Sequence, residues 1–193
     1  FKAASKCSVK YIKLGYWRYE GFGSIAAQIE ETRRRLRELY ALSREHDVTA
    51  TIHTHAGPYL SADPGLLATL LEDYDPEWLG AYVDPGHLFA ESGPLGVEMI
   101  LDLLAPYVRL VAVKNYRWLR VLDEQTKELR WKMRMMPVKE EIVAWPTVFR
   151  CLRQIGFDGC ISVHSEYEHL NSEELIRQTK EDLEYLKNVL KNI

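Results

Sequence analysis

Short apolar segments alternate with longer amphipathic ones along this chain of 193 residues, and the alternation restricts its fold more than any other feature. Five apolar segments, rich in β-branched or aromatic residues, have the length of buried strands: Val9–Leu14, Val48–His53, Ala81–Asp84, Val108–Val113 and Cys160–His164. Strands separated by helices form βα units, and βα units build a parallel sheet. We therefore predict an α/β fold, either a (β/α)8 barrel or a doubly wound sheet, because periodicity alone does not distinguish the two.

Capping residues mark where three of the intervening helices begin. Ser24 precedes a long amphipathic segment, Asp63 is followed by Pro64, and Asn171 stands three residues before Glu174. Ser, Asp and Asn accept hydrogen bonds from the free backbone N–H groups of a first helical turn, and proline is favoured at the first helical position. We expect a helix to start after each of these three capping residues.

A stretch at about residues 117–145 interrupts the alternation and is expected to be an insertion. The segments Arg120–Leu122 and Glu128–Trp131 flank the polar sequence Asp123–Lys127, a pattern that predicts a β-hairpin. An insertion after a strand either covers the site as a lid or only packs against the domain, and the sequence leaves both open. Because the chain has no linker and no internal repeat, residues 1–193 are expected to form a single domain.

Charge and cysteine content argue against several classes of protein. The formal net charge is −3, and the chain has neither a basic block nor an apolar run long enough to span a membrane. We therefore expect no nucleic-acid partner and no membrane. Cys7, Cys151 and Cys160 lack CxxC spacing, so we expect neither a disulfide framework nor a thiolate zinc site. A reducing, cytoplasmic location fits this pattern.

Histidine and carboxylate side chains gather where the predicted strands end. Three strand ends carry such pairs: His53 and His55, Asp84 and His87, and His164 and Glu166. The members of the first and third pairs are two residues apart and share one face of an extended strand. A tight Pro-Gly turn is expected to bring the members of the second pair together. A single histidine is more often a hydrogen-bonded interior residue, but three such strand ends together favour one functional pocket.

The side-chain types in this pocket favour a divalent metal ion. Imidazole and carboxylate ligands suit Zn²⁺, Mn²⁺ or Co²⁺ better than Ca²⁺, and Mg²⁺ is expected less than these three. Lys114 ends a further strand, where its ammonium either holds a substrate oxygen or forms a buried salt bridge. Trp118, Trp131 and Trp145 are expected in the core more than as platforms that stack on a sugar.

Three motifs, in this order and spacing, resemble those of a known family. They are Asp84-Pro85-Gly86-His87, then Val113-Lys114-Asn115, and then the segment Gly159–Tyr167. Their order along essentially the whole chain is similar to that of the xylose isomerase-like TIM-barrel superfamily, which includes sugar phosphate isomerases and epimerases and endonuclease IV.

The resemblance implies a (β/α)8 TIM barrel of which the chain covers approximately strands four to eight, with the N-terminal βα units absent. Five strands cannot close a barrel and would leave long parallel edges exposed. We expect that the native chain has a further N-terminal segment, or that another chain (a homo-oligomer) or a swapped segment covers these edges.

The resemblance also implies a set of site residues. Asp84 and Glu166 match two of the family's metal ligands, His53 stands in place of a glutamate ligand, and Ala112 stands in place of a histidine ligand. The implied ligands of one divalent metal ion are therefore His53, Asp84 and Glu166. We assign catalysis to Glu166, His87 and Lys114, and substrate binding to His55, His164, Lys114 and Trp118.

The activity implied by the resemblance is that of a metal-dependent isomerase or epimerase. Such an enzyme moves a proton at a carbon next to a metal-bound oxygen of a small sugar, polyol or sugar phosphate. One alternative is an endonuclease IV-like phosphodiesterase, which needs further histidine ligands and gains no support from the net charge of −3. The other is a barrel that has lost its catalytic ligands and binds a sugar-like ligand; His53 and Ala112 support that reading.

Overall fold

The computed structural model describes residues 1–93, 96–140 and 142–193, so residue 141 of the predicted insertion lies outside the described residues. Five parallel strands form one sheet in the order β1-β2-β3-β4-β7. These strands are β1 (Tyr11–Lys13), β2 (Thr49–His53), β3 (Leu79–Val83), β4 (Val108–Val113) and β7 (Cys160–Val163). Neighbours in the sheet follow the chain order, as in a curled half-barrel. Four of the strands lie within the segments predicted from the sequence, whereas β3 overlaps the predicted segment Ala81–Asp84 but begins two residues earlier, at Leu79.

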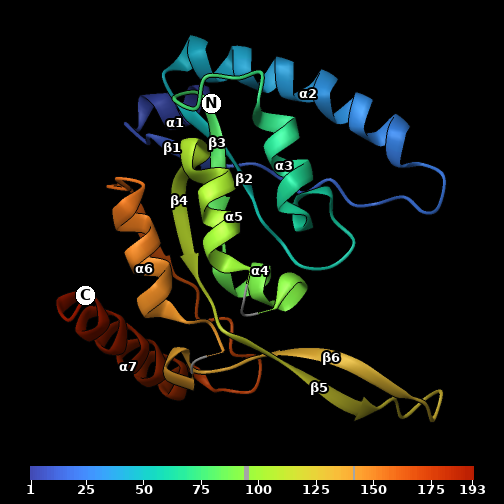
Figure 1. Ribbon diagram of the computed structural model, residues 1–193, viewed down its shortest axis with the longest axis vertical. Coiled ribbons are helices and arrows are strands. Elements are labelled where there is room, and N and C mark those ends of the chain that lie inside the picture. Colours follow the sequence, from blue (N-terminus) through green and yellow to red (C-terminus); the bar gives the residue numbers. More distant parts are fainter. Residues whose placement is uncertain (94–95, 141) are drawn as a thin grey trace.

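Helices connect the strands and cover one face of the sheet (Figure 1). The α-helices are α1 (Lys2–Lys6), α2 (Ile25–His46), α3 (Pro64–Leu71), α4 (Pro85–Ser92), α5 (Val97–Leu104), α6 (Trp145–Gln154) and α7 (Ser172–Lys191). Short 3-10 turns are η1 (Leu60–Ala62), η2 (Ala105–Tyr107) and η3 (Val138–Glu140). Among the described residues, no helix is long and apolar enough to cross a lipid bilayer.

Two of the three predicted helix caps form as expected, and the third does not. Asp63 accepts a hydrogen bond from the Leu66 N–H at 2.7 Å, and Asn171 forms a reciprocal capping box with Glu174. Ser24 stands at the predicted position but has a helical backbone conformation and makes no side-chain cap. Its hydroxyl instead donates to the Gly21 carbonyl at 2.7 Å, so it stabilises the preceding loop.

The turn predicted after Asp84 is a helix. Pro85 occupies the first turn of α4, and Asp84 Oδ1 accepts a hydrogen bond from the His87 N–H at 3.1 Å, which is the geometry of an N-cap. The prediction of a tight turn was therefore wrong, although His87 does lie next to Asp84. Gly86 allows α4 to approach β4, because a Cβ there would lie 2.6 Å from the Lys114 carbonyl oxygen.

The two faces of the sheet have different chemistry. Side chains of one parity, such as Ile52, Val83 and Val111, pack beneath the helices in the hydrophobic core. The opposite parity carries polar residues, because successive side chains of a strand point to opposite faces. His53 and Lys114 belong to this second set. The face away from the helices is therefore where the chemical groups collect.

An antiparallel hairpin follows β4 and extends away from the sheet (Figure 1). Its strands are β5 (Tyr116–Leu122) and β6 (Leu129–Met135). Trp118 lies on β5 and donates its indole N–H to the Ala90 carbonyl at 2.9 Å, yet it is 46% exposed, and Trp131 on β6 is 67% exposed. The expectation of core tryptophans was right for the fully buried Trp145 and wrong for these two, because the hairpin projects beyond the core.

Candidate active site

The polar strand ends predicted from the sequence lie at the carboxyl edge of the sheet. His53 ends β2, Asp84 follows β3, Lys114 follows β4 and His164 follows β7. Because side chains alternate along a strand, all four side chains project from the face of the sheet that is not covered by the helices. His53 and Asp84 are fully buried and Lys114 is almost so. Parallel strands bring their carboxyl ends to one edge, which is the usual place of a ligand site in such folds.

Asp84 is the centre of this cluster. Its Oδ2 atom lies 3.5 Å from His53 Nε2, 3.7 Å from His87 Nε2 and 3.8 Å from Lys114 Nζ. Its backbone N–H donates to the Thr54 hydroxyl at 2.7 Å, which fixes its position. Burial favours the neutral acid, but the contact with His53 and the positive potential of the neighbouring groups outweigh it and lower the pKa of Asp84. The carboxylate is therefore ionised at neutral pH.

Lys114 links the buried cluster to a more exposed carboxylate. Its ammonium donates a hydrogen bond to Glu166 Oε2 at 3.0 Å and lies 3.4 Å from His87 Nε2. The Lys114 side chain is 4% exposed, whereas that of Glu166 is 60% exposed. The salt bridge considered for Lys114 thus exists, and it holds the ammonium between an ionised interior residue and a carboxylate that solvent can reach.

Three imidazoles of the site are neutral at physiological pH. Burial lowers the pKa of His87 to about 3, despite the opposing effect of Asp84. Burial also lowers the pKa values of His55 and His164. The His55 and His87 rings stack with centroids 4.1 Å apart, and the Tyr116 ring lies 4.9 Å from His87. A neutral imidazole can either accept or donate a proton, as general acid–base chemistry requires.

Lowering the pH is expected to decrease the free energy of unfolding below about pH 6.5, the ordinary value for histidine. Between that value and about 3, the unfolded chain binds a proton at His87 that the folded chain does not, which favours unfolding by about 1.4 kcal/mol per pH unit. Urea denaturation at pH 8, 6 and 5 measures the effect. A His87→Gln variant should show a shallower pH dependence, and equal dependence in both proteins would contradict the assignment.

Sequence reasoning missed several hydroxyl groups of the site. The Tyr16 hydroxyl lies 3.1 Å from His53 Nδ1 and accepts a hydrogen bond from Lys13 Nζ at 3.1 Å. The Tyr82 hydroxyl contacts both Ser162 Oγ and His164 Nε2. Tyr82 and Ser162 stand two residues before Asp84 and His164, so the strand period could have identified them. Tyr16 follows β1 across a loop, and nothing in the sequence pattern marks it.

A cavity of about 420 Å³ opens beside this cluster. Its volume lies within the usual range for ligand pockets. Its lining residues are His55, His87, Tyr116, Lys132, Met133, Arg134, Met135, Glu166, Glu168 and His169. Three of the predicted site residues therefore line it. His53, Asp84 and Lys114 lie behind that lining, in contact with His87 or Glu166.

Besides Lys114, two further predicted substrate-binding residues, His164 and Trp118, do not line the cavity. His164 is held by Tyr82 and Ser162, and its Nδ1 atom lies 3.6 Å from Glu166 Oε1. It therefore contacts the cavity lining through Glu166, and its ring also stacks on that of His53, with centroids 6.2 Å apart. Trp118 lies on the hairpin and hydrogen-bonds to α4, so the structure does not bring it to the other predicted residues.

The walls of the cavity share a support on α7. Tyr167, between the lining residues Glu166 and Glu168, donates its hydroxyl to the buried carboxylate of Asp182. Asp182 also accepts the Val138 N–H at 3.0 Å, just beyond the end of β6. One carboxylate of α7 thus holds both the β7–α7 loop and the base of the hairpin.

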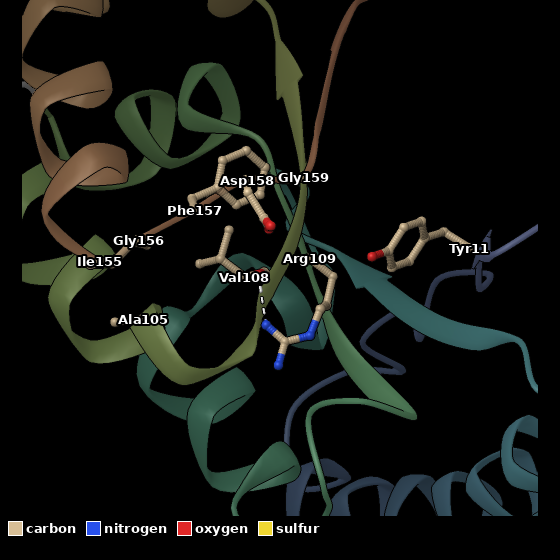
Figure 2. A pocket seen from close by; sticks show the side chains of 9 residues that line it. All are labelled: Tyr11, Ala105, Val108, Arg109, Ile155, Gly156, Phe157, Asp158 and Gly159. Carbon is tan, nitrogen blue, oxygen red and sulfur yellow. Dashed lines mark hydrogen bonds between the residues drawn. The ribbon is translucent and has the colours of Figure 1, made fainter.

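A second cavity, of about 200 Å³, lies at the opposite edge of the sheet (Figure 2). Figure 2 shows Tyr11, Arg109 and Asp158 around it. These residues lie at the amino-terminal ends of strands, and the Arg109 guanidinium donates to the Val108 and Pro76 carbonyls. None of the predicted site residues is there, so the candidate site is the cavity at the carboxyl edge.

The proposed metal ligands fit a metal ion in part. His53 Nε2 and Asp84 Oδ2 are buried, lack hydrogen-bond partners among the described residues, and lie 3.5 Å apart. Two ligands about 2.1 Å from one ion would have a similar separation. Glu166, however, is bound to Lys114. In the described part of the chain, no group of three His, Cys, Asp or Glu side chains is placed to hold a metal.

The model of a protein family described as xylose isomerase-like TIM barrel matches residues 1–189 of the chain. No curated protein sequence matches the chain significantly.

Solved structures share the fold at low sequence identity. A D-tagatose 3-epimerase-like protein is 17% identical, with a TM-score of 0.70, and the match covers 97% of this chain and 64% of that one. A xylose isomerase domain protein from Planctomyces limnophilus is 20% identical (TM-score 0.71; coverage 98% and 61%). A xylose isomerase-like TIM barrel protein from Mycobacterium smegmatis, in complex with magnesium, is 18% identical (TM-score 0.66; coverage 98% and 64%). The chain thus spans less than two thirds of the length of each of these structures.

Proposed function

The chain belongs to the xylose isomerase-like TIM barrel family, and from this we propose that it is an isomerase or epimerase acting on a small sugar, polyol or sugar phosphate. The observation that carries the proposal is the group formed by Glu166, Lys114 and His87. The Lys114 ammonium lies 3.0 Å from the Glu166 carboxylate and 3.4 Å from the neutral His87 imidazole, and the last two residues line one cavity. A base, an acid and a positive charge are the groups that a proton shift next to a carbonyl requires.

Each of these three residues has a distinct role in the proposed reaction. Glu166 is the most exposed of them; its carboxylate removes the proton from the carbon next to the substrate carbonyl, and a proton is then returned to carbon to form the isomer or epimer. Lys114 lies directly behind His87 and Glu166, and its positive charge stabilises the negative charge that develops on the substrate oxygen. His87 is neutral and exchanges a proton with that oxygen. His55 stacks on His87 and contributes to the cavity wall that positions the substrate.

We further propose that the enzyme uses one divalent metal ion, Mn²⁺, Zn²⁺ or Co²⁺ in preference to Mg²⁺. His53 and Asp84 would hold it, and Glu166 would complete the set on leaving Lys114. Support comes from His53 Nε2 and Asp84 Oδ2, which have no hydrogen-bond partner among the described residues. The Tyr16 hydroxyl on His53 Nδ1 also supports the proposal, because it fixes the imidazole orientation as partners of metal ligands usually do. When bound, the ion would polarise the substrate oxygens and acidify the neighbouring C–H bond.

The alternative is a barrel that binds a sugar without turnover, and the Lys114–Glu166 ion pair favours this alternative because it occupies a proposed metal ligand. The metal content of the protein distinguishes the two. Elemental analysis of the purified protein should find about one transition-metal ion per chain. His53→Gln should lower the affinity for that ion by at least tenfold in a chelator competition, because one ligand is lost. His46→Gln, on the remote helix α2, is the matched control. Absence of metal would reject the proposed metal dependence, and equal affinity in both variants would remove His53 from the metal site.

The reaction itself is tested by solvent exchange. The protein is incubated in D₂O with a panel of aldoses, ketoses, polyols and their phosphates, and proton NMR follows the carbons next to oxygen. We expect deuterium to enter the position next to the carbonyl of an accepted substrate together with formation of its isomer or epimer. If the metal-loaded protein exchanged no proton on any member of the panel, the proposed function would be rejected.

A further inference from the structure

The charges on the wall of the active-site cavity are unevenly balanced. Four lining residues carry formal charge at neutral pH: Lys132, Arg134, Glu166 and Glu168. Glu166 is paired with Lys114 at 3.0 Å. Among the described residues, neither Lys132 nor Arg134 makes a hydrogen bond or an ion pair with a protein group. Two uncompensated cations and one carboxylate, Glu168, therefore remain on the wall.

The hairpin places these two cations side by side. Lys132 and Arg134 are two residues apart on β6 and project from the same face of the strand. Arg134 is paired across the hairpin with Arg117, and like charges in directly opposite positions destabilise a sheet. Arg117 is compensated by Glu140 at 3.2 Å, whereas Arg134 has no such partner in the described part of the chain. An anion bound at Arg134 would relieve the electrostatic repulsion between Arg117 and Arg134.

The reacting groups belong to the other walls of the cavity, not to the wall formed by Lys132 and Arg134. His55, His87 and Tyr116 form its aromatic side, and Glu166 brings the proposed base. A ligand that places its carbonyl at Glu166 and His87 can therefore extend towards β6. An arginine binds phosphate or carboxylate oxygens through a fork of N–H groups, and a nearby lysine adds a point charge.

We infer that Lys132 and Arg134 form a subsite for an anionic group, so the substrate carries a phosphate or a carboxylate at the end remote from the reacting carbon. The inference rests on the proposed function only in treating this cavity as the place of reaction. Contacts with a non-reacting anionic group supply binding energy that orients the substrate. The hairpin thus determines specificity, while the strand ends carry the chemistry.

Calorimetric binding of matched ligands tests the subsite without requiring turnover. Fructose 6-phosphate and glucuronate are each compared with fructose, and inorganic phosphate serves as competitor. We expect at least one anionic ligand to bind ten or more times more tightly than fructose, and phosphate or salt to weaken it. Preference for the phosphate ester identifies a phosphorylated substrate, and preference for glucuronate identifies a sugar acid. Equal affinity for all three ligands would overturn the inference.

Single substitutions test whether Lys132 and Arg134 cause the preference for anionic ligands. Lys132→Gln and Arg134→Gln should each weaken binding of the preferred anionic ligand about tenfold, the usual cost of one charge-assisted hydrogen bond. Arg120→Gln is the matched control, because Arg120 is an exposed cation of the same hairpin that does not line the cavity. Equal losses in all three variants would indicate non-specific charge attraction and overturn the subsite.

The two proposals fail in different ways. If the anion preference and its loss in the β6 variants are observed but no substrate exchanges deuterium, the subsite stands and the proposed function falls. If a neutral sugar exchanges deuterium and the β6 variants react as fast as the native protein, the function stands and the subsite falls.

Discussion

Replacing Glu166 with Gln is expected to lower the rate of solvent exchange and of turnover by about 10²–10⁴-fold. Gln has nearly the same size and can still accept a hydrogen bond from Lys114, but it cannot take up the substrate proton. Because the Glu166 side chain is 60% exposed, the free energy of unfolding should change little. The loss should therefore appear in kcat far more than in ligand binding.

Glu168→Gln is the matched control for this experiment. Glu168 lines the same cavity and stands two residues away, but among the described residues it makes no hydrogen bond or ion pair with Lys114. We expect it to retain most of the turnover. Retention of turnover in Glu166→Gln as well would show that another group removes the proton.

Replacing Lys114 with Met is expected to lower the free energy of unfolding by about 3–5 kcal/mol, the usual cost of removing one partner of a buried charge pair. Met has a similar length, so the packing changes little while the ammonium is lost. The fully buried Asp84 carboxylate would then lose the positive charge 3.8 Å from its Oδ2 atom. Urea denaturation at pH 7 measures the change.

A double-mutant cycle attributes this effect to Asp84. If the buried carboxylate causes the loss, Asp84→Asn combined with Lys114→Met should be less destabilised than the sum of the two single changes. Additive losses, or a loss below about 1 kcal/mol for Lys114→Met, would show that Asp84 does not depend on the ammonium.

The fold and the family could be predicted from the sequence because both depend on short-range patterns. The alternation of apolar segments predicted the parallel strands, and the motifs around Asp84, Lys114 and Glu166 indicated the family that matches residues 1–189. The prediction of a partial barrel is confirmed by structures of which the chain spans 61–64%. Strand parity also brought His53 and Lys114 to one face, since a period of two needs no knowledge of distant contacts.

Contacts between distant segments could not be predicted in the same way. The ion pair of Lys114 and Glu166 depends on where two long, flexible side chains meet across the sheet edge. The hydroxyl of Tyr16 reaches His53 from a loop that carries no pattern. The exposure of Trp118 depends on the direction in which the hairpin leaves β4, and composition contains no information on that direction.

The support that Asp182 gives to both walls of the cavity bears on how the cavity would select ligands by size. The β7–α7 loop is attached to α7 through Tyr167, and the base of the hairpin is attached through Val138, so one helix contributes to the spacing of the two walls. This shared attachment opposes separation of the two walls by a bulky ligand, because pulling Val138 or Tyr167 away from α7 would break a buried hydrogen bond. A change of preferred substrate length would then require substitutions in α7, far in sequence from the reacting groups.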